Sequence, residues 1–430
     1  MKYLGCNPPK RGYKRAVYII FAIFHILCIS IVLNALDWLE FVRVFRYNDM
    51  KLIMLRATMV LFSLVMGQRI LLFACTFKKY QIIKDAVKRS SFNFECFGIN
   101  NINVDSVSNG SCRKEKLSFS SIWTGAKLSF SESNELESFR LKSMVEMGAR
   151  CSAILNAEIA LCVILSIFWN YKETHGELFE DYNPYLNKTS LYRKTQLRFY
   201  MPFDSSLEGH DALATCVTLY TRFGILLLFL PIDSVLPSIL AFLIAQTRIV
   251  QEAFKYVDKN ISPSQSPRNV FLIKEIRIVK CINELQEIYR ILDMLQNLYS
   301  FQTLLQCGLG TFLLCTLGYI APMVSDGSEL FCFGTFLIAV TEEIFILSYV
   351  SNTLTIELQN VAIDLYNIEW DSYPIRVKKL IEFTLRRIQK PASLTACKLF
   401  NIDLAVFIQM LQTAYSFYTV ISSTSEKLVA

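Results

Sequence analysis

The chain has 430 residues, of which 53% are hydrophobic and only 19% are charged, and its mean hydropathy is +0.35. A water-soluble protein of this length cannot cover so much apolar surface with polar side chains, so the composition excludes a soluble globular protein and indicates a membrane protein. Apolar runs recur along the whole sequence without a shift in composition, which predicts a single membrane domain over residues 1–430.

Seven apolar runs are long enough to cross a hydrocarbon core of roughly 30 Å as a helix, so an all-α fold with seven transmembrane helices is predicted. The expected spans are about 16–36, 52–75, 149–169, 213–245, 298–323, 329–350 and 402–423. The first run is too long for a cleaved signal peptide and has no A-x-A site, so it is expected to remain as an anchor. In the fourth run, Asp233 lies between Pro231 and Pro237, which predicts a kink and an exit from the membrane.

Lys and Arg are distributed unevenly between the segments that separate these runs. With the N-terminus inside, the inner segments carry 31 Lys and Arg residues and the outer segments carry 9. Because cytoplasmic segments near the membrane keep an excess of positive charge, the sequence predicts a cytoplasmic N-terminus and an extracellular C-terminus. This orientation is opposite to that of a G-protein-coupled receptor.

Cysteines and glycosylation sequons were compared with this topology. All 13 cysteines lie in the apolar runs or the inner segments, so no disulfide is expected in the outer loops. Sequons occur at Asn109, Asn187 and Asn260, and only Asn187 is expected to face outward. Asn187 is therefore the predicted glycosylation site, and the other two are expected to be silent.

The inner segments are of two kinds. Residues 90–135 are rich in Ser and Asn without steady periodicity, which is typical of a flexible cytoplasmic insertion. Residues 268–297 and 356–390 carry apolar residues at helical spacing among charges. Helices are therefore expected to continue from the membrane into a cytoplasmic anchor layer, where subunits would meet.

Enzyme chemistry has little support in the sequence. There are only three His, and the motifs of metalloproteases, serine hydrolases and phosphate-binding loops are absent, so we expect no catalysis, no metal, no cofactor and no nucleic-acid partner. Glu158, Glu342 and Glu343 lie inside apolar runs, where a charge is costly and usually faces a partner or a cavity. Pairing with neighbouring helices is expected, with ion coordination by Glu342 and Glu343 as the open alternative.

The last apolar run carries a polar stripe. At 100° per residue its polar side chains fall within an arc of about 120°, which holds one apolar residue, Val420. The stripe consists of Gln409, Gln412, Thr413, Ser416, Thr419 and Ser423. Hydrogen bonding between helices is one use of such a stripe; a water-filled path, formed where several copies meet around an axis, is the interpretation we favour.

Several short motifs stand near the end of the chain: Ala362, Tyr366 and Trp370, then Gln389-Lys390-Pro391, then Ala414-Tyr415-Ser416-Phe417-Tyr418-Thr419, with Met201-Pro202-Phe203-Asp204 upstream. Together they strongly resemble the C-terminal signature of insect odorant receptors. The family's shared co-receptor has valine followed three residues later by glutamine near its end, whereas this chain has Val420 and Ser423. The chain therefore looks like an odorant-tuning subunit.

The resemblance implies a ligand-gated, non-selective cation channel in the plasma membrane of olfactory neuron dendrites. Four subunits, including the co-receptor, would place their last helices around one pore, with Val420 at the gate. A volatile odorant or pheromone would enter a pocket in the outer half of the bundle. The matching pocket positions are Met59, Phe62, Cys162, Leu165, Ser166, Trp169, Cys216, Tyr220, Phe331, Thr335 and Phe336. A G-protein-coupled chemoreceptor and a membrane transporter are the alternatives, although neither accounts for the polar stripe.

Overall fold

The computed structural model describes residues 33–44, 50–89, 135–175, 178–183, 188–193, 232–259, 267–320 and 327–429, with a few positions between 212 and 220. Its helices are α2 (Leu33–Val44), α3 (Met50–Arg89), α5 (Glu135–His175), α7 (Val235–Lys255), α8 (Pro267–Ile320), α9 (Gly327–Tyr366), α10 (Ile375–Ile388) and α11 (Leu404–Val429). Two short hairpins pair β1 (Leu178–Asn183) with β2 (Lys188–Arg193) and β3 (Thr395–Ala396) with β4 (Phe400–Asn401).

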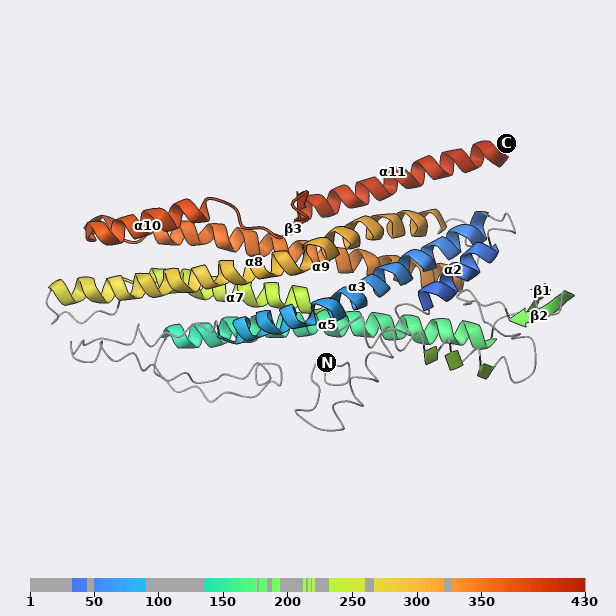
Figure 1. Cartoon of the computed structure of the whole chain (residues 1–430), viewed down its shortest axis with the longest axis horizontal. Helices are drawn as coiled ribbons and strands as arrows, with labels where there is room; N and C mark the ends of the chain where they lie inside the picture. The colour runs from blue at the N-terminus through green and yellow to red at the C-terminus, as the bar shows by residue number, and fades with distance from the viewer. Residues whose placement is uncertain are drawn as a thin grey trace.

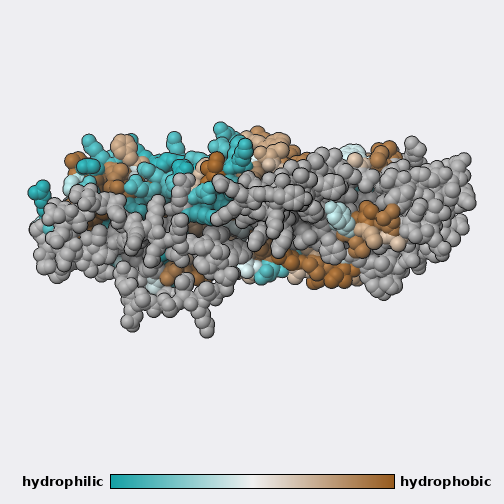
Figure 2. Space-filling model, turned by 60° about the horizontal axis from the view of Figure 1, so that its bottom comes forward, coloured by the Kyte–Doolittle hydropathy of each residue, from teal (hydrophilic) through white to brown (hydrophobic). Residues whose placement is uncertain are grey.

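The molecule is an elongated bundle in which the long helices lie side by side (Figure 1). Hydrophilic residues gather over the half that contains α10, and the visible part of the other half is mostly hydrophobic (Figure 2). The 54-residue helix α8 and the 40-residue helix α9 extend through both halves. The predicted continuation of membrane helices into a polar layer is therefore confirmed for residues 268–297, which form the first part of α8.

Among the described residues, five helices are long and apolar enough to cross a membrane: α3, α5, α7, α8 and α9. They contain the second, third and sixth expected spans, the fifth up to Ile320, and the end of the fourth. The seventh span coincides with α11. The first span lies outside the described residues except for its last positions, which begin α2, and most of the insertion expected at 90–135 also lies outside them.

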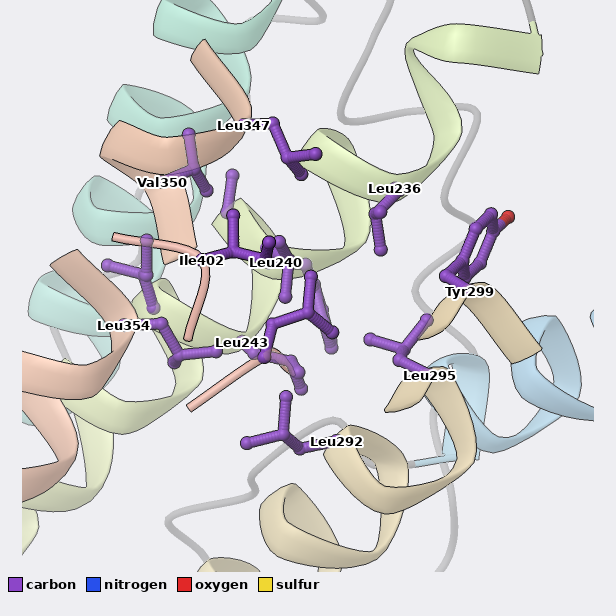
Figure 3. Packing of buried hydrophobic residues seen from close by; sticks show 14 of the residues in the cluster. Leu236, Leu240, Leu243, Leu292, Leu295, Tyr299, Leu347, Val350, Leu354 and Ile402 are labelled. Carbon is purple, nitrogen blue, oxygen red and sulfur yellow. The ribbon is translucent and has the colours of Figure 1, made fainter. Parts of the chain in front are cut away.

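The core is densest where α7, α8 and α9 meet the segment that leads into α11. Leu240 and Leu243 of α7, Leu295 of α8 and Leu354 of α9 converge there with Ile402, and all five are nearly inaccessible to solvent (Figure 3). Aliphatic side chains packed from several helices in this way stabilise the fold by removing apolar area from water and by close van der Waals contact. This cluster fixes the positions of the helices that surround the candidate site.

A buried arginine binds the backbone just after the C-terminal end of α7. Arg277 of α8 is 1% exposed, and its Nη1 donates hydrogen bonds to the carbonyl oxygens of Tyr256 (3.3 Å), Val257 (3.0 Å) and Lys259 (2.7 Å). Tyr256 is the C-cap of α7, and Val257 and Lys259 lie in the turn that follows it, where buried carbonyl groups need donors from outside the helix. Arg277 supplies a donor here and connects α7 to α8.

The β3–β4 hairpin fastens the start of α11 to α8. Thr395 and Gln296 exchange hydrogen bonds, from the Thr395 N–H to Gln296 Oε1 (2.7 Å) and from Gln296 Nε2 to the Thr395 carbonyl (2.7 Å). The Cys397 N–H donates to Ser300 Oγ at 2.8 Å. Cys397 and Lys398 have φ values of 49° and 61°, in the left-handed region that non-glycine residues seldom adopt. These bonds hold the turn in that conformation.

Two features of the fold differ from the sequence-based expectations. The helix expected over 356–390 is interrupted, because α9 ends at Tyr366 and α10 begins only after Pro374. Proline disfavours the helical conformation for the residue before it, and Tyr373 is accordingly extended. The β1–β2 hairpin was not expected, because the sequence predicted an all-helical fold. The rest of the described fold is nearly all helical.

Candidate functional site

Part of the predicted pocket is formed by α3 and α9. The rings of Phe62 and Phe336 meet edge to face, with centroids 4.9 Å apart and an interplanar angle of 81°. This is a favourable geometry for an aromatic pair. Phe336 is buried, and Met59, one turn before Phe62 on α3, is buried in the same hydrophobic cluster. The structure thus brings Phe62 and Phe336 together and buries Met59 on the same helix as Phe62.

A second aromatic contact joins α5 to α9. Phe168 lies 5.3 Å from Phe331 between ring centroids, and the Thr335 hydroxyl donates a hydrogen bond to the Phe331 carbonyl. Phe168 was not among the predicted pocket residues. It neighbours Trp169, and sequence alone does not show which of two adjacent aromatic residues faces the next helix.

The other predicted pocket residues lie on α5 or in the sparsely described segment before α7. Cys162, Leu165 and Ser166 are half-buried on α5, and the Ser166 hydroxyl donates to the Cys162 carbonyl at 2.8 Å, within its own helix. Cys216 and Tyr220 are exposed, in the part of the chain where few positions are described. Trp169 lies on α5, but its side chain is outside the described part. The pocket assignment therefore stays a prediction.

The polar stripe of α11 faces away from the rest of its own chain. The opposite face carries Met410 and Ala414, both buried, and Phe407, whose ring lies 5.5 Å from that of Phe345 on α9. Val420 is 60% exposed, and the remaining members of the stripe are all exposed: Gln409, Gln412, Thr413, Ser416, Thr419 and Ser423. In the described part of the chain, no other helix covers the stripe.

The hydroxyl groups of the stripe donate to the backbone of α11. Thr413 Oγ1 lies 2.7 Å from the Gln409 carbonyl oxygen and Ser416 Oγ lies 2.9 Å from that of Gln412. Ser423 Oγ makes the same kind of contact, at 3.0 Å, with the Val420 carbonyl. Because their protons are used within the helix, these hydroxyls need no acceptor on another helix and present oxygen lone pairs outward. Such a surface suits contact with water or cations.

An ion network joins four parts of the bundle at its centre. Arg69 of α3, 1% exposed, pairs with Asp233 just before α7 (2.6 Å) and with Glu343 of α9. Gln306 of α8 donates to the same Glu343 oxygen at 2.8 Å. Glu158 of α5 lies within electrostatic range of Asp233, Glu342 and Glu343. The expected pairing of Glu343 with another helix is confirmed.

The partner of Glu343 was not identified from the sequence. Arg69 is separated from Glu343 by 274 residues, and its place inside an apolar run was the one available signal. A buried cation in such a run requires a carboxylate partner, but the choice among Glu158, Glu342 and Glu343 depends on how the helices pack.

Long apolar helices around a buried ion network, followed by a one-sided polar helix, define a membrane protein of several spans. The chain belongs to the 7tm odorant receptor family, whose model matches residues 126–415. This is a family of receptors, so the expectation that the chain is not an enzyme is confirmed.

Individual relatives are distant. Odorant receptor 10 of Aedes albopictus is 19% identical over 194 residues, which cover 45% of this chain and 50% of that protein. Odorant receptor 2a of Drosophila melanogaster is 21% identical over 214 residues, covering 48% of this chain and 54% of that protein. Each of these matches spans about half the length of the relative.

Solved structures resemble the chain over nearly its whole length. The insect olfactory receptor OR5 from Machilis hrabei superposes with a TM-score of 0.70 at 13% identity, covering 96% of this chain and 92% of that one. Its complex with eugenol gives a TM-score of 0.72 at 12% identity and covers 98% and 94%. At such identities the likeness shows the fold, and it confirms the predicted all-helical membrane architecture.

Proposed function

We propose that this chain is the odorant-tuning subunit of an odorant-gated, non-selective cation channel. The observation that carries this proposal is the polar stripe of α11, which is exposed on the side of the helix away from its own bundle. A row of amides and hydroxyls facing lipid would be costly, whereas the same row is favourable along a water-filled path. Several copies around one axis would enclose that path.

Assembly with the family's co-receptor is part of the proposal. Ser423 stands where the co-receptor has glutamine, and the 31-to-9 distribution of Lys and Arg supports a cytoplasmic N-terminus. The polar half of the bundle is formed by α10, the first part of α8 and the last part of α9. It would then be the cytoplasmic layer through which four subunits meet (Figure 2). The expected location is the plasma membrane of olfactory neuron dendrites.

The ligand class follows from the proposed pocket. The aromatic contacts of Phe62 with Phe336 and of Phe168 with Phe331 give it apolar walls, and Thr335 is the nearby hydroxyl. Such a lining suits a small volatile with one polar group. The related Machilis receptor in complex with eugenol, an aromatic volatile, is consistent with this class.

The deciding experiment is co-expression with the co-receptor in a heterologous cell, with currents recorded against an odorant panel that includes eugenol. We expect at least one volatile to evoke a current that the co-receptor alone does not give. The chain expressed alone should give little or no current. A nucleotide-dependent current, or a robust odorant-evoked current from the lone chain, would contradict the proposed subunit role.

A further inference from the structure

Two side-chain contacts join α3 and α9, and they are separated by the same number of residues on both helices. Phe62 contacts Phe336, and seven residues further along both helices Arg69 contacts Glu343. Seven residues correspond to two helical turns, about 10 Å along the axis. Because both steps run in the same direction along the chain, the two helices point the same way over this stretch, bridged by these two side-chain contacts. If α9 rotates or shifts where Phe336 meets Phe62, the position of Glu343 relative to Arg69 therefore changes as well.

Glu343 is also linked to α11 through its own helix, α9, and through α8, which binds it. On α9, Phe345 lies two residues after Glu343 and contacts Phe407 of α11. On α8, Gln306 bonds to Glu343, and Phe312 stacks on Phe417 of α11 with centroids 6.1 Å apart. The two contacts on α11 are ten residues apart, so the start and the middle of the stripe are held by α9, which carries Glu343, and by α8, which binds it.

The helices α8 and α9 approach each other closely beside this point. A side chain added at Gly310 of α8 would come within 2.9 Å of the Ile344 terminal methyl on α9. Small residues allow membrane helices to approach each other in this way. Tightly packed helices transmit small shifts because interiors leave little free volume.

We propose that Glu343, held by Arg69 and Gln306, is the positioning residue that couples the Phe62–Phe336 contact to the orientation of α11. The inference rests on the proposed function, since it assigns α3 and α9 to the ligand pocket and α11 to the pore. Arg69 is anchored independently by Asp233, so it provides a fixed point against which α9 is positioned. Loss of the Glu343 carboxylate frees α9 from this point without removing any residue of the pocket or the pore.

The test measures the position of α11 directly. Ser416→Cys is introduced on the stripe, the chain is co-expressed with the co-receptor, and labelling by a membrane-impermeant methanethiosulfonate biotin is timed per surface chain. The chain without the added cysteine gives the background from native thiols. We expect Glu343→Gln to change the labelling rate at least about twofold, the lower end of what residues in coupling networks contribute.

Glu342→Gln is the matched control. It removes the same charge one residue away, and the described part of the structure shows no hydrogen bond or ion pair of the Glu342 side chain. Its labelling rate should equal that of the parent. An unchanged rate in Glu343→Gln, or an equal change in both variants, overturns the proposal. If Glu343→Gln fails to reach the surface, Gln306→Asn is used in its place. Its shorter side chain moves the amide of α8 away from Glu343 and leaves every charge in place, so an unchanged labelling rate in this variant overturns the proposal.

Labelling requires neither an odorant nor a current, so this outcome is separate from that of the proposed function. Where the panel supplies an active volatile, its concentration for half-maximal current should increase in Glu343→Gln while cation selectivity stays unchanged. A residue needed only for folding would lower the surface amount and leave both the labelling rate and this concentration unaltered. Failure of every panel volatile would count against the proposed function and leave the labelling result standing.

Discussion

Replacing Arg277 by methionine tests how the polar layer is held together. Methionine keeps most of the length of the side chain and removes the guanidinium that binds three carbonyl oxygens at the end of α7. One Nη1 carries two protons, so the three contacts amount to about two full hydrogen bonds. Each charge-assisted bond is worth about 1.5–3 kcal/mol. Relief of the buried charge offsets part of this loss, which leaves an expected destabilisation of about 3 kcal/mol.

The measurement is thermal stability in detergent, followed as loss of the monodisperse peak of a fluorescent fusion. At about 2 °C per kcal/mol for a large chain, Arg277→Met should lower the midpoint by about 6 °C. Arg290→Met on the same helix is the control, since Arg290 is half exposed and pairs with Glu287 within α8. That pair is worth at most about 0.5 kcal/mol. Equal losses in the two variants would refute a special role for Arg277.

Four further predictions concern the channel and its topology. Val420→Ser should wet the constriction and raise the resting current of the co-expressed channel; a resting current equal to that of the parent would contradict the gate. In the open channel, a cysteine at Val420 should react faster with water-soluble thiol reagents than one at Phe417, which stacks on α8, and equal rates would argue against a pore-lining stripe. Trp169→Ala should shift the odorant response and leave ion selectivity unchanged, so a selectivity change would count against its place in the pocket. Asn187→Gln should abolish any glycan mass shift, and a shift that follows Asn109 would reverse the topology.

The direction of the polar stripe could be predicted from the sequence alone. The 100° spacing separates Gln409, Ser416 and Val420 from Met410 and Ala414, and the structure exposes the first three and buries the last two. The angles follow from helix geometry alone, but Leu411 and Phe417 on the other face are exposed as well, so the role of the stripe stays a prediction. The same logic identified the first half of α8 from its apolar spacing.

Features that depend on distant partners could not be predicted in this way. The choice of Glu343 as the partner of Arg69 depends on the register between α3 and α9, which no local pattern encodes. The β1–β2 hairpin also depends on pairing between two segments, because isolated short strands have little stability of their own. The break between α9 and α10 did have a local signal in Pro374, which the apolar spacing on either side obscured.

The β3–β4 hairpin fixes the start of α11, so a small tilt there displaces residues further along the helix. Its base is fixed to Gln296 and Ser300 of α8 by hydrogen bonds, and Val420 lies sixteen residues beyond Leu404, where the helix begins. At 1.5 Å per residue this arm is about 24 Å long, so a tilt of about 5° at the base displaces Val420 by about 2 Å. In the proposed four-fold pore, opposing arms would change the opening by about 4 Å, which exceeds the width of a water molecule at about 2.8 Å. Because Phe417 stacks on Phe312 of α8 only three residues before Val420, such a tilt requires this contact to shift with it, which ties the opening of the pore to α8.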